Sequence, residues 1–173
     1  PLLNTISTLY RTLEAPETWD SALAGLADAL DADHVVLDLR SASPVPYALL
    51  ATRIPDDYLE QLAAHPEYER LYATVLGTGS GHAIHSAQVI DRQMRSRSAL
   101  FNDVIRPMGG HHAIFGLIPV SAGQEHPALI SACRAASRAD FPMRPVQYLD
   151  SLLPHLASVL RLHQRLVPGL PTG

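Results

Sequence analysis

The spacing of apolar residues changes early in the chain. Over residues 2–13 and again over residues 19–30, apolar residues recur every three or four positions, which predicts two helices. Pro16 suits the first turn of the second helix, because that turn has no use for the N–H that proline lacks. Over residues 34–40 apolar residues fall at every second position, as in a half-buried strand, and a second strand is predicted over residues 47–52.

Both spacings return along the rest of the chain. Helices are predicted after Pro55, after Pro66 and over residues 95–105, and strands over residues 82–86, 112–120 and 128–136. The last two strands are joined by a polar connection and should form an antiparallel hairpin. A long leucine-rich helix is predicted over residues 143–167.

This order of elements predicts a single α+β domain. Strands joined by hairpins, with helices at both ends and in the middle, indicate a mostly antiparallel sheet of five or six strands. N-terminal helices occupy residues 1–31, the sheet and its inserted helices residues 34–142, and the C-terminal helix residues 143–167. The order is typical of PAS/GAF-like sensor domains, and another α+β arrangement with one sheet is the alternative. A chain of 173 residues is long enough for one such core.

The C-terminal helix has the most regular pattern. Its first row has the four-three spacing of a coiled-coil seam and consists of Leu149, Leu153, Leu156, Leu160, His163 and Val167. A second row of Leu152, Val159 and Leu166 recurs every seven residues. Either both rows cover the core of a monomer, or this helix also pairs with a second copy in a homodimer. Pro154 is expected to kink the helix or to begin a new one.

Composition excludes several classes of function. The formal net charge of −4 gives no general attraction to nucleic-acid phosphates. All 13 basic residues are arginine, so the lysine on which P-loop enzymes, kinases and Schiff-base enzymes depend is absent. Cys133 is the only cysteine, which excludes an intrachain disulfide and a cysteine-rich metal site. Neither a secretion leader nor a membrane span is evident, so a cytoplasmic protein is expected.

Neither a metal site nor a catalytic site is predicted. His82 and His85 lie in a strand-like context that would separate their side chains, and the adjacent His111 and His112 would also diverge. Residues 77–81 are rich in glycine but match neither a nucleophile elbow nor a dinucleotide fingerprint. No cofactor is indicated.

Two other kinds of function remain open. A haem or metal sensor would use His155 and His163 of the last helix. A small stand-alone enzyme would draw its groups from His82, His85, His112 and Asp103.

A pocket for a small molecule is a further hypothesis. Such pockets have apolar walls with a few polar groups, and an enclosed sheet face could turn aromatic and polar side chains toward a ligand. The candidates are Tyr47, Tyr58, Tyr68, Tyr72, Phe101, His112 and Phe115.

Three segments resemble the N-terminal sensor regions of LuxR-type helix-turn-helix regulators. They are residues 97–109 (RSALFNDVIRPMG), residues 152–156 (LLPHL) and the aromatic and leucine positions of residues 9–23. The resemblance implies a sensor domain that signals through its last helix to a C-terminal DNA-binding domain. That domain is absent here, and the chain, which begins at Pro1 and ends in a Pro- and Gly-rich stretch, is expected to be a piece of a longer protein.

Overall fold

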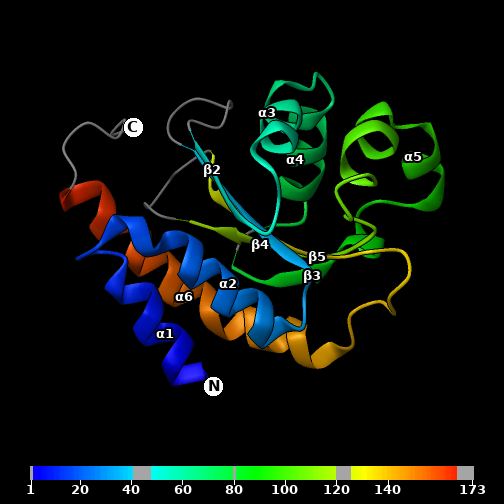
Figure 1. Cartoon of the computed structure of the whole chain (residues 1–173). Helices are drawn as coiled ribbons and strands as arrows, with labels where there is room; N and C mark the ends of the chain where they lie inside the picture. The colour runs from blue at the N-terminus through cyan, green and yellow to red at the C-terminus, as the bar shows by residue number, and fades with distance from the viewer. Residues whose placement is uncertain (1, 41–47, 80, 120–125, 167–173) are drawn as a thin grey trace.

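The computed structural model describes residues 2–40, 48–79, 81–119 and 126–166 (Figure 1). Its α-helices are α1 (Leu2–Arg11), α2 (Trp19–Leu30), α3 (Asp56–Ala64), α4 (Tyr68–Leu76), α5 (Arg92–Arg97) and α6 (Met143–Leu166). Two short 3-10 helices, η1 (Pro16–Thr18) and η2 (Ser86–Gln88), and a π-helix, η3 (Leu100–Ile105), complete the helical elements. The strands are β1 (His34–Leu39), β2 (Ala48–Thr52), β3 (Ala83–His85), β4 (His112–Ile118) and β5 (Ala128–Arg134).

The strands form one antiparallel sheet in the order β2-β1-β5-β4-β3. β4 and β5 pair as the predicted hairpin, with Phe115 opposite Ser131. β5 also pairs with β1, which brings the first strand to the centre of the sheet beside the last one. The predicted α+β class, with a five-stranded antiparallel sheet, flanking helices and a long C-terminal helix, is confirmed.

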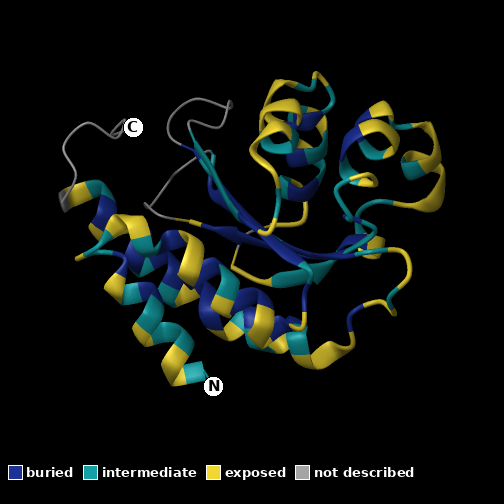
Figure 2. Ribbon diagram, viewed as in Figure 1, coloured by how far each residue is buried: buried dark blue, intermediate teal, exposed yellow. Residues whose placement is uncertain are grey.

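Helices cover both faces of this sheet. Figure 1 shows α1, α2 and α6 on one side and α3, α4 and α5 on the other. Side chains alternate between the faces, so Leu37 and Ile130 join the core beneath α2 and α6, while Phe115 and Leu129 pack with residues of α4. The sheet is buried between the two layers (Figure 2).

From Leu149 to His163, both apolar rows of α6 are buried within the chain. Leu149, Leu152, Leu156 and Val159 have no exposed surface, and His163 is also buried, with its Nε2 accepting a hydrogen bond of 3.2 Å from Trp19 Nε1. Val167 lies outside the described residues. The face that α6 leaves to solvent carries other residues, among them Pro154, Arg161 and Leu162. Pairing of α6 with a second copy stays a prediction, and it would have to involve that outer face.

The helix predicted over residues 95–105 is wrong in one respect, because the structure divides it at Ser98. Asp91 caps α5 by accepting a 2.7 Å hydrogen bond from the Met94 N–H, so the helix starts earlier than predicted. Ser98 has an extended backbone, and its hydroxyl donates a 2.6 Å hydrogen bond to Glu67. A contact from a residue 31 positions away therefore sets the break, which local spacing could not reveal.

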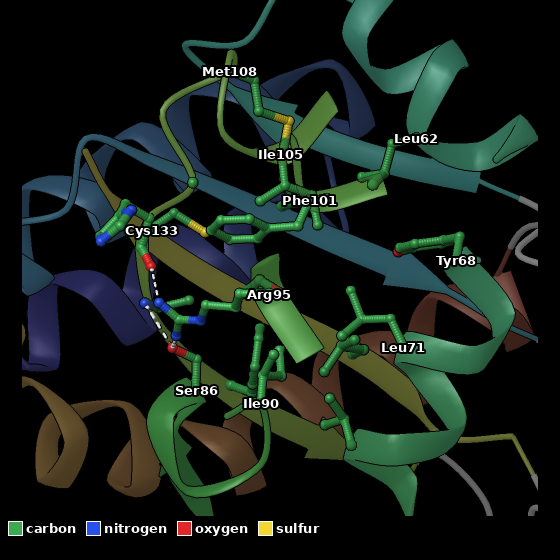
Figure 3. Close-up of a pocket in the computed structure, with 18 residues that line it drawn as sticks. Leu62, Tyr68, Leu71, Ser86, Ile90, Arg95, Phe101, Ile105, Met108 and Cys133 are labelled. Carbon is green, nitrogen blue, oxygen red and sulfur yellow. Dashed lines mark hydrogen bonds between the residues drawn. The ribbon is translucent and has the colours of Figure 1, made fainter. Parts of the chain in front are cut away.

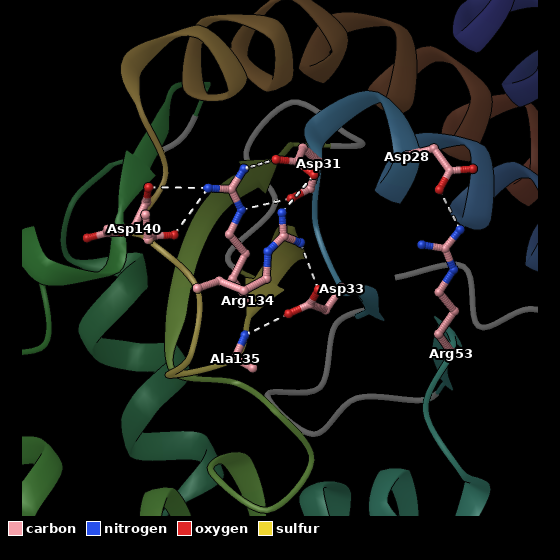
Figure 4. A network of polar contacts seen from close by, with 9 residues as sticks. Asp28, Asp31, Asp33, Arg53, Arg134, Ala135 and Asp140 are labelled. Carbon is pink, nitrogen blue, oxygen red and sulfur yellow. Dashed lines mark hydrogen bonds and ion pairs between the residues drawn. The ribbon is translucent and has the colours of Figure 1, made fainter.

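A network of ion pairs fixes the start of β1 against the end of β5 (Figure 4). Asp31 ends α2 in a left-handed conformation, with φ of 53°, and pairs with both Arg134 (2.9 Å) and Arg138 (2.7 Å). Asp33 pairs with Arg138 at 2.8 Å and accepts a hydrogen bond of 2.8 Å from the Ala135 N–H. These contacts anchor the register of the two central strands.

Candidate ligand cavity

The sheet face beneath α3, α4 and η3 has a cavity with about 60 Å³ of free space (Figure 3). Its floor consists of side chains from the three central strands: Val36, Ala113, Phe115, Leu129, Ser131 and Cys133. Successive side chains of a strand point to opposite faces, so the intervening Ile114 and Ile130 belong to the core under α6 instead. The strand alternation thus assigns one set of residues to the cavity and the other to the C-terminal helix.

The other walls come mainly from the helical layer and are mostly apolar. α3 supplies Leu62, α4 supplies Leu71 and Val75, and η3 supplies Phe101 and Ile105. π-helical segments often occur at functional sites, and here one places an aromatic ring over the cavity. An apolar wall of this kind favours a ligand with an apolar part.

Three polar residues line one edge of the cavity. Arg95 of α5 donates hydrogen bonds of 2.8 Å to the His111 carbonyl oxygen and to Ser86 Oγ (Figure 3). Ser86 Oγ also accepts a 3.2 Å hydrogen bond from the Ala113 N–H. The Nδ1 atom of His111 is buried and has no hydrogen-bond partner in the described part of the chain. Polar groups aimed into an apolar site are the usual source of ligand orientation.

A larger cleft adjoins the cavity. The cleft holds about 340 Å³ between α4 and the segment formed by α5 and η3. Five residues line both spaces: Leu71, Ile90, Arg95, Phe101 and Ile105. Arg95 and the Phe101 ring, 5.5 Å apart from guanidinium carbon to ring centroid, therefore stand at the junction between cavity and cleft.

A buried ionic cluster holds α4 on β1 beside the cavity. Asp38 and Arg40 are fully buried and pair at 2.8 Å, and Arg40 pairs with Glu69 of α4 at 2.9 Å. The Tyr68 hydroxyl donates a 2.8 Å hydrogen bond to Asp38, and the Arg40 guanidinium lies 3.4 Å from the Tyr72 ring centroid. Burial raises the pKa of the Asp38 carboxyl, against the opposing effects of Arg40 and Tyr68. Because Tyr68 also lines the cavity, this cluster positions one of its walls.

The seven predicted pocket residues have different places in the structure. Tyr68, Phe101 and Phe115 line the cavity. Tyr72 is buried beside it and donates a 2.8 Å hydrogen bond to the Pro127 carbonyl oxygen, while Tyr58 is half-buried and lines neither cavity nor cleft.

The other two candidates lie elsewhere. His112 also does not line the cavity, and its Nδ1 atom is 3.7 Å from Asp140 Oδ1. Tyr47 lies outside the described residues.

Sequence analysis did not identify the three polar residues at the edge of the cavity. Nothing in the sequence distinguishes Arg95, Ser86 and His111 individually, and Arg95 lies in a stretch with two other arginines, Arg92 and Arg97. The only available signal was the adjacent histidine pair, which sequence analysis treated as a metal question. Cys133, the only cysteine, is part of the cavity floor, and burial raises the pKa of its thiol to about 12. The thiol is therefore protonated at neutral pH and a weak nucleophile.

The histidines proposed for alternative chemistry do not assemble into one hydrogen-bonded group in the described residues. His85 and His112 approach Asp140 at 3.9 and 3.7 Å, whereas His82 is exposed and lies 3.7 Å from Asp150. Asp103 is exposed on η3. Within the same described residues there is no group of three or more His, Cys, Asp or Glu side chains that could hold a metal ion.

Comparison with known proteins identifies the fold. Neither a protein-family model nor a curated protein sequence matches the chain. Among solved structures, the VqsR ligand-binding domain from Pseudomonas aeruginosa matches with a TM-score of 0.69 at 14% identity, over 96% of this chain and 97% of that chain. The chain has the fold of this domain.

Two further structures support this assignment. A GAF domain/HD domain protein from Geobacter sulfurreducens matches with a TM-score of 0.60 at 13% identity, over 92% of this chain and 98% of that chain. CepR2 from Burkholderia cenocepacia, an N-acylhomoserine lactone dependent LuxR family transcription factor, matches with a TM-score of 0.52 at 13% identity, over 96% of each chain. The GAF-like fold found here is thus one that ligand-binding domains of LuxR-type regulators share. No helix in the described residues is long and apolar enough to cross a membrane.

Proposed function

We propose that this domain is the small-molecule sensor of a LuxR-type transcription regulator and that its ligand binds in the cavity between the sheet and the α3, α4 and η3 layer. The observation that carries the proposal is the cavity itself, an apolar space of about 60 Å³ with polar groups along one edge. The fold is shared with CepR2, which depends on N-acylhomoserine lactone, a small molecule. Enzymatic activity has no comparable support, because the cavity lacks an activated nucleophile or a hydrogen-bonded acid–base pair among the described residues.

Strand β4 offers a direct connection from the cavity to α6. Ala113 and Phe115 line the cavity from one face of β4, whereas Gly116 on the other face packs against Leu153 of α6. A ligand changes a conformational equilibrium only through different affinities for the two states. A ligand that displaces Phe115 would shift β4 and so change the packing of Gly116 against Leu153 of α6.

Strand β3 offers a second connection. Ser86 at the polar edge follows β3 directly, and within that strand the Ala83 N–H donates a 2.8 Å hydrogen bond to Asp150 of α6. Through these two strands, ligand binding in the cavity would change the position of α6. That change would be transmitted to a DNA-binding domain elsewhere in the regulator. A homodimer and a cytoplasmic location remain predictions of the sequence.

A thermal-shift experiment tests the sensor. The panel consists of hexanoate, hexanamide, octanoate and octanamide, which combine short apolar chains with two polar heads. A compound at ten times its Kd should raise the melting temperature by about 3–6 °C, from RT ln(1 + [L]/Kd) and the usual temperature dependence for a chain of this size. Melting temperatures unchanged by all four compounds would count against an apolar ligand in this cavity.

A filled-cavity variant makes the test specific. Ala113→Val adds two carbon atoms to the cavity floor and should abolish the shifts while leaving a folded protein, because valine suits a strand. Ala63→Val, the same substitution at an exposed position of α3, is the control and should keep the shifts. Equal shifts in both variants would place the binding site elsewhere.

A further inference from the structure

Arg95 is the only fully charged side chain among the described residues that line the cavity. It forms no ion pair within the described part of the chain, and both of its hydrogen-bond acceptors there, the His111 carbonyl oxygen and Ser86 Oγ, are neutral. A guanidinium has five N–H donors, so three remain for a ligand after these two bonds. Neutral acceptors satisfy hydrogen bonds but do not balance a positive charge beside an apolar cavity.

The surroundings of Arg95 also favour an anion. Arg70, Arg95 and Arg97 line the adjoining cleft together with one acidic residue, Glu67. Glu67 is already engaged, since it pairs with Arg70 at 3.0 Å and accepts a 2.6 Å hydrogen bond from Ser98. The junction is therefore locally positive in a chain whose formal net charge is −4.

Two neutral polar groups, the Ser86 hydroxyl and the His111 Nδ1 atom, lie at the same edge of the cavity as Arg95. Ser86 is almost fully buried, and its Oγ accepts from Arg95 and from the Ala113 N–H, which leaves its own O–H free to donate into the cavity. Burial lowers the pKa of His111, and the positive charges of Arg95 and Arg106 act in the same direction. The buried Nδ1 atom of His111 has no partner in the described residues, and a ligand oxygen would supply one when this nitrogen is protonated.

We propose that the ligand is a small amphipathic carboxylate whose carboxylate group binds Arg95 at the junction and whose aliphatic part fills the apolar cavity. This inference rests on the proposed function. A carboxylate matches the planar donor fork of a guanidinium, which a single neutral carbonyl does not. The cavity of about 60 Å³ has room for about four to six atoms of the size of a water molecule, so the apolar part is short.

Isothermal titration of the unaltered protein at 0.15 M salt tests this head-group preference without any substitution. Hexanoate and hexanamide have the same chain and nearly the same shape but differ in charge. Hexanoate should bind about 10- to 100-fold more tightly, as expected for hydrogen bonds to a charged group. Equal affinities would overturn the carboxylate proposal and leave the sensor proposal standing, whereas no binding by either compound, or by the octyl pair, would count against both.

Substitutions then assign the preference to one residue. Arg95→Gln should remove the preference for hexanoate, and Arg95→Lys should keep it with a weaker affinity, because the charge remains without the fork. Arg92→Gln is the matched control: it removes the same charge from the same helix at a position that lines neither cavity nor cleft, and it should behave as the unaltered protein. A loss of preference in Arg92→Gln equal to that in Arg95→Gln would overturn the assignment to Arg95.

Discussion

Gly116 of β4 lies directly against Leu153 of α6, so closely that a Cβ atom at residue 116 would be 2.6 Å from Leu153 Cδ2. The same Cβ would lie 3.2 Å from Ile130 Cγ2 of the neighbouring strand. A side chain at residue 116 therefore requires the Leu153 side chain, or α6 itself, to shift. Phe115, the residue before Gly116 in β4, lines the cavity, so this contact between α6 and the sheet lies one residue from the candidate ligand site.

Gly116→Ala should therefore destabilise the protein by about 1–3 kcal/mol, the usual cost of overpacking a core. Gly25→Ala provides the control, because a Cβ at residue 25 of α2 would have no atom within 4 Å. That substitution should stabilise the protein by about 0.5–1 kcal/mol, since glycine is a poor helix former. Urea denaturation measures both free energies of unfolding. Equal effects of the two substitutions would contradict the close packing of Gly116 on Leu153.

Tyr68→Phe should cost about 1.5–3 kcal/mol, because it removes a hydrogen bond to the buried carboxylate of Asp38. Tyr58→Phe is the matched control: Tyr58 is half-buried, and its hydroxyl makes no hydrogen bond to another described residue. Its effect should stay within about 0.5 kcal/mol. The comparison is made by chemical denaturation at pH 7. A Tyr68→Phe protein as stable as Tyr58→Phe would show that the hydroxyl does not support the ionic cluster.

His34 should make stability depend on pH. Burial lowers the pKa of His34 to about 4, and its Nε2 has no hydrogen-bond partner in the described chain. Between about pH 6.5 and pH 4, His34 binds a proton in the unfolded state but not in the folded state. The free energy of unfolding should therefore fall as the pH drops through this range. The contribution is about 3 kcal/mol, from about 1.4 kcal/mol per pKa unit.

His34→Phe checks this origin, because it keeps an aromatic ring and removes the titration. Denaturation midpoints between pH 7 and pH 4 should change less in this variant than in the unaltered protein. His82→Phe, at an exposed histidine, should retain the full dependence. Identical pH profiles for all three proteins would contradict the role assigned to His34.

Leu156→Asp should unfold the protein or destabilise it by more than about 4 kcal/mol, because it places a carboxylate in the core between α6 and the rest of the chain. Leu162→Asp, on the outer face of α6, should change stability by about 0.5 kcal/mol or less. Sedimentation velocity at several dilutions separates folding from self-association. If α6 pairs with a second copy, Leu162→Asp should weaken the dimer and remain folded. A folded, monomeric Leu156→Asp protein would contradict the burial of this row.

The fold was predictable to a large extent because its elements have strong local signals. The alternation over residues 112–120 and 128–136 predicted the β4–β5 hairpin, and the leucine spacing of the last helix predicted α6. The break at Ser98 was not predictable, since it depends on Glu67, which is distant in sequence. For the same reason the sequence could not decide which faces of α6 the protein itself covers.

The residues of the candidate site were likewise predicted only in part. Phe101, Phe115 and Tyr68 were expected from their aromatic character, and all three line the cavity. Arg95 and Ser86 were not, because an arginine in a polar stretch is ordinarily a solvent-exposed residue. Only the folded chain brings the Arg95 guanidinium within 2.8 Å of Ser86, nine residues earlier in the sequence.

By itself, the sequence determined the class of fold, the positions of most strands and helices, and the absence of lysine-dependent chemistry, because period and composition are local properties. The tertiary structure decided which side of each strand faces the cavity, which side chains of α6 the protein itself covers, and that Arg95 lines an apolar cavity. These properties depend on contacts between residues far apart in the chain, and no local pattern specifies them.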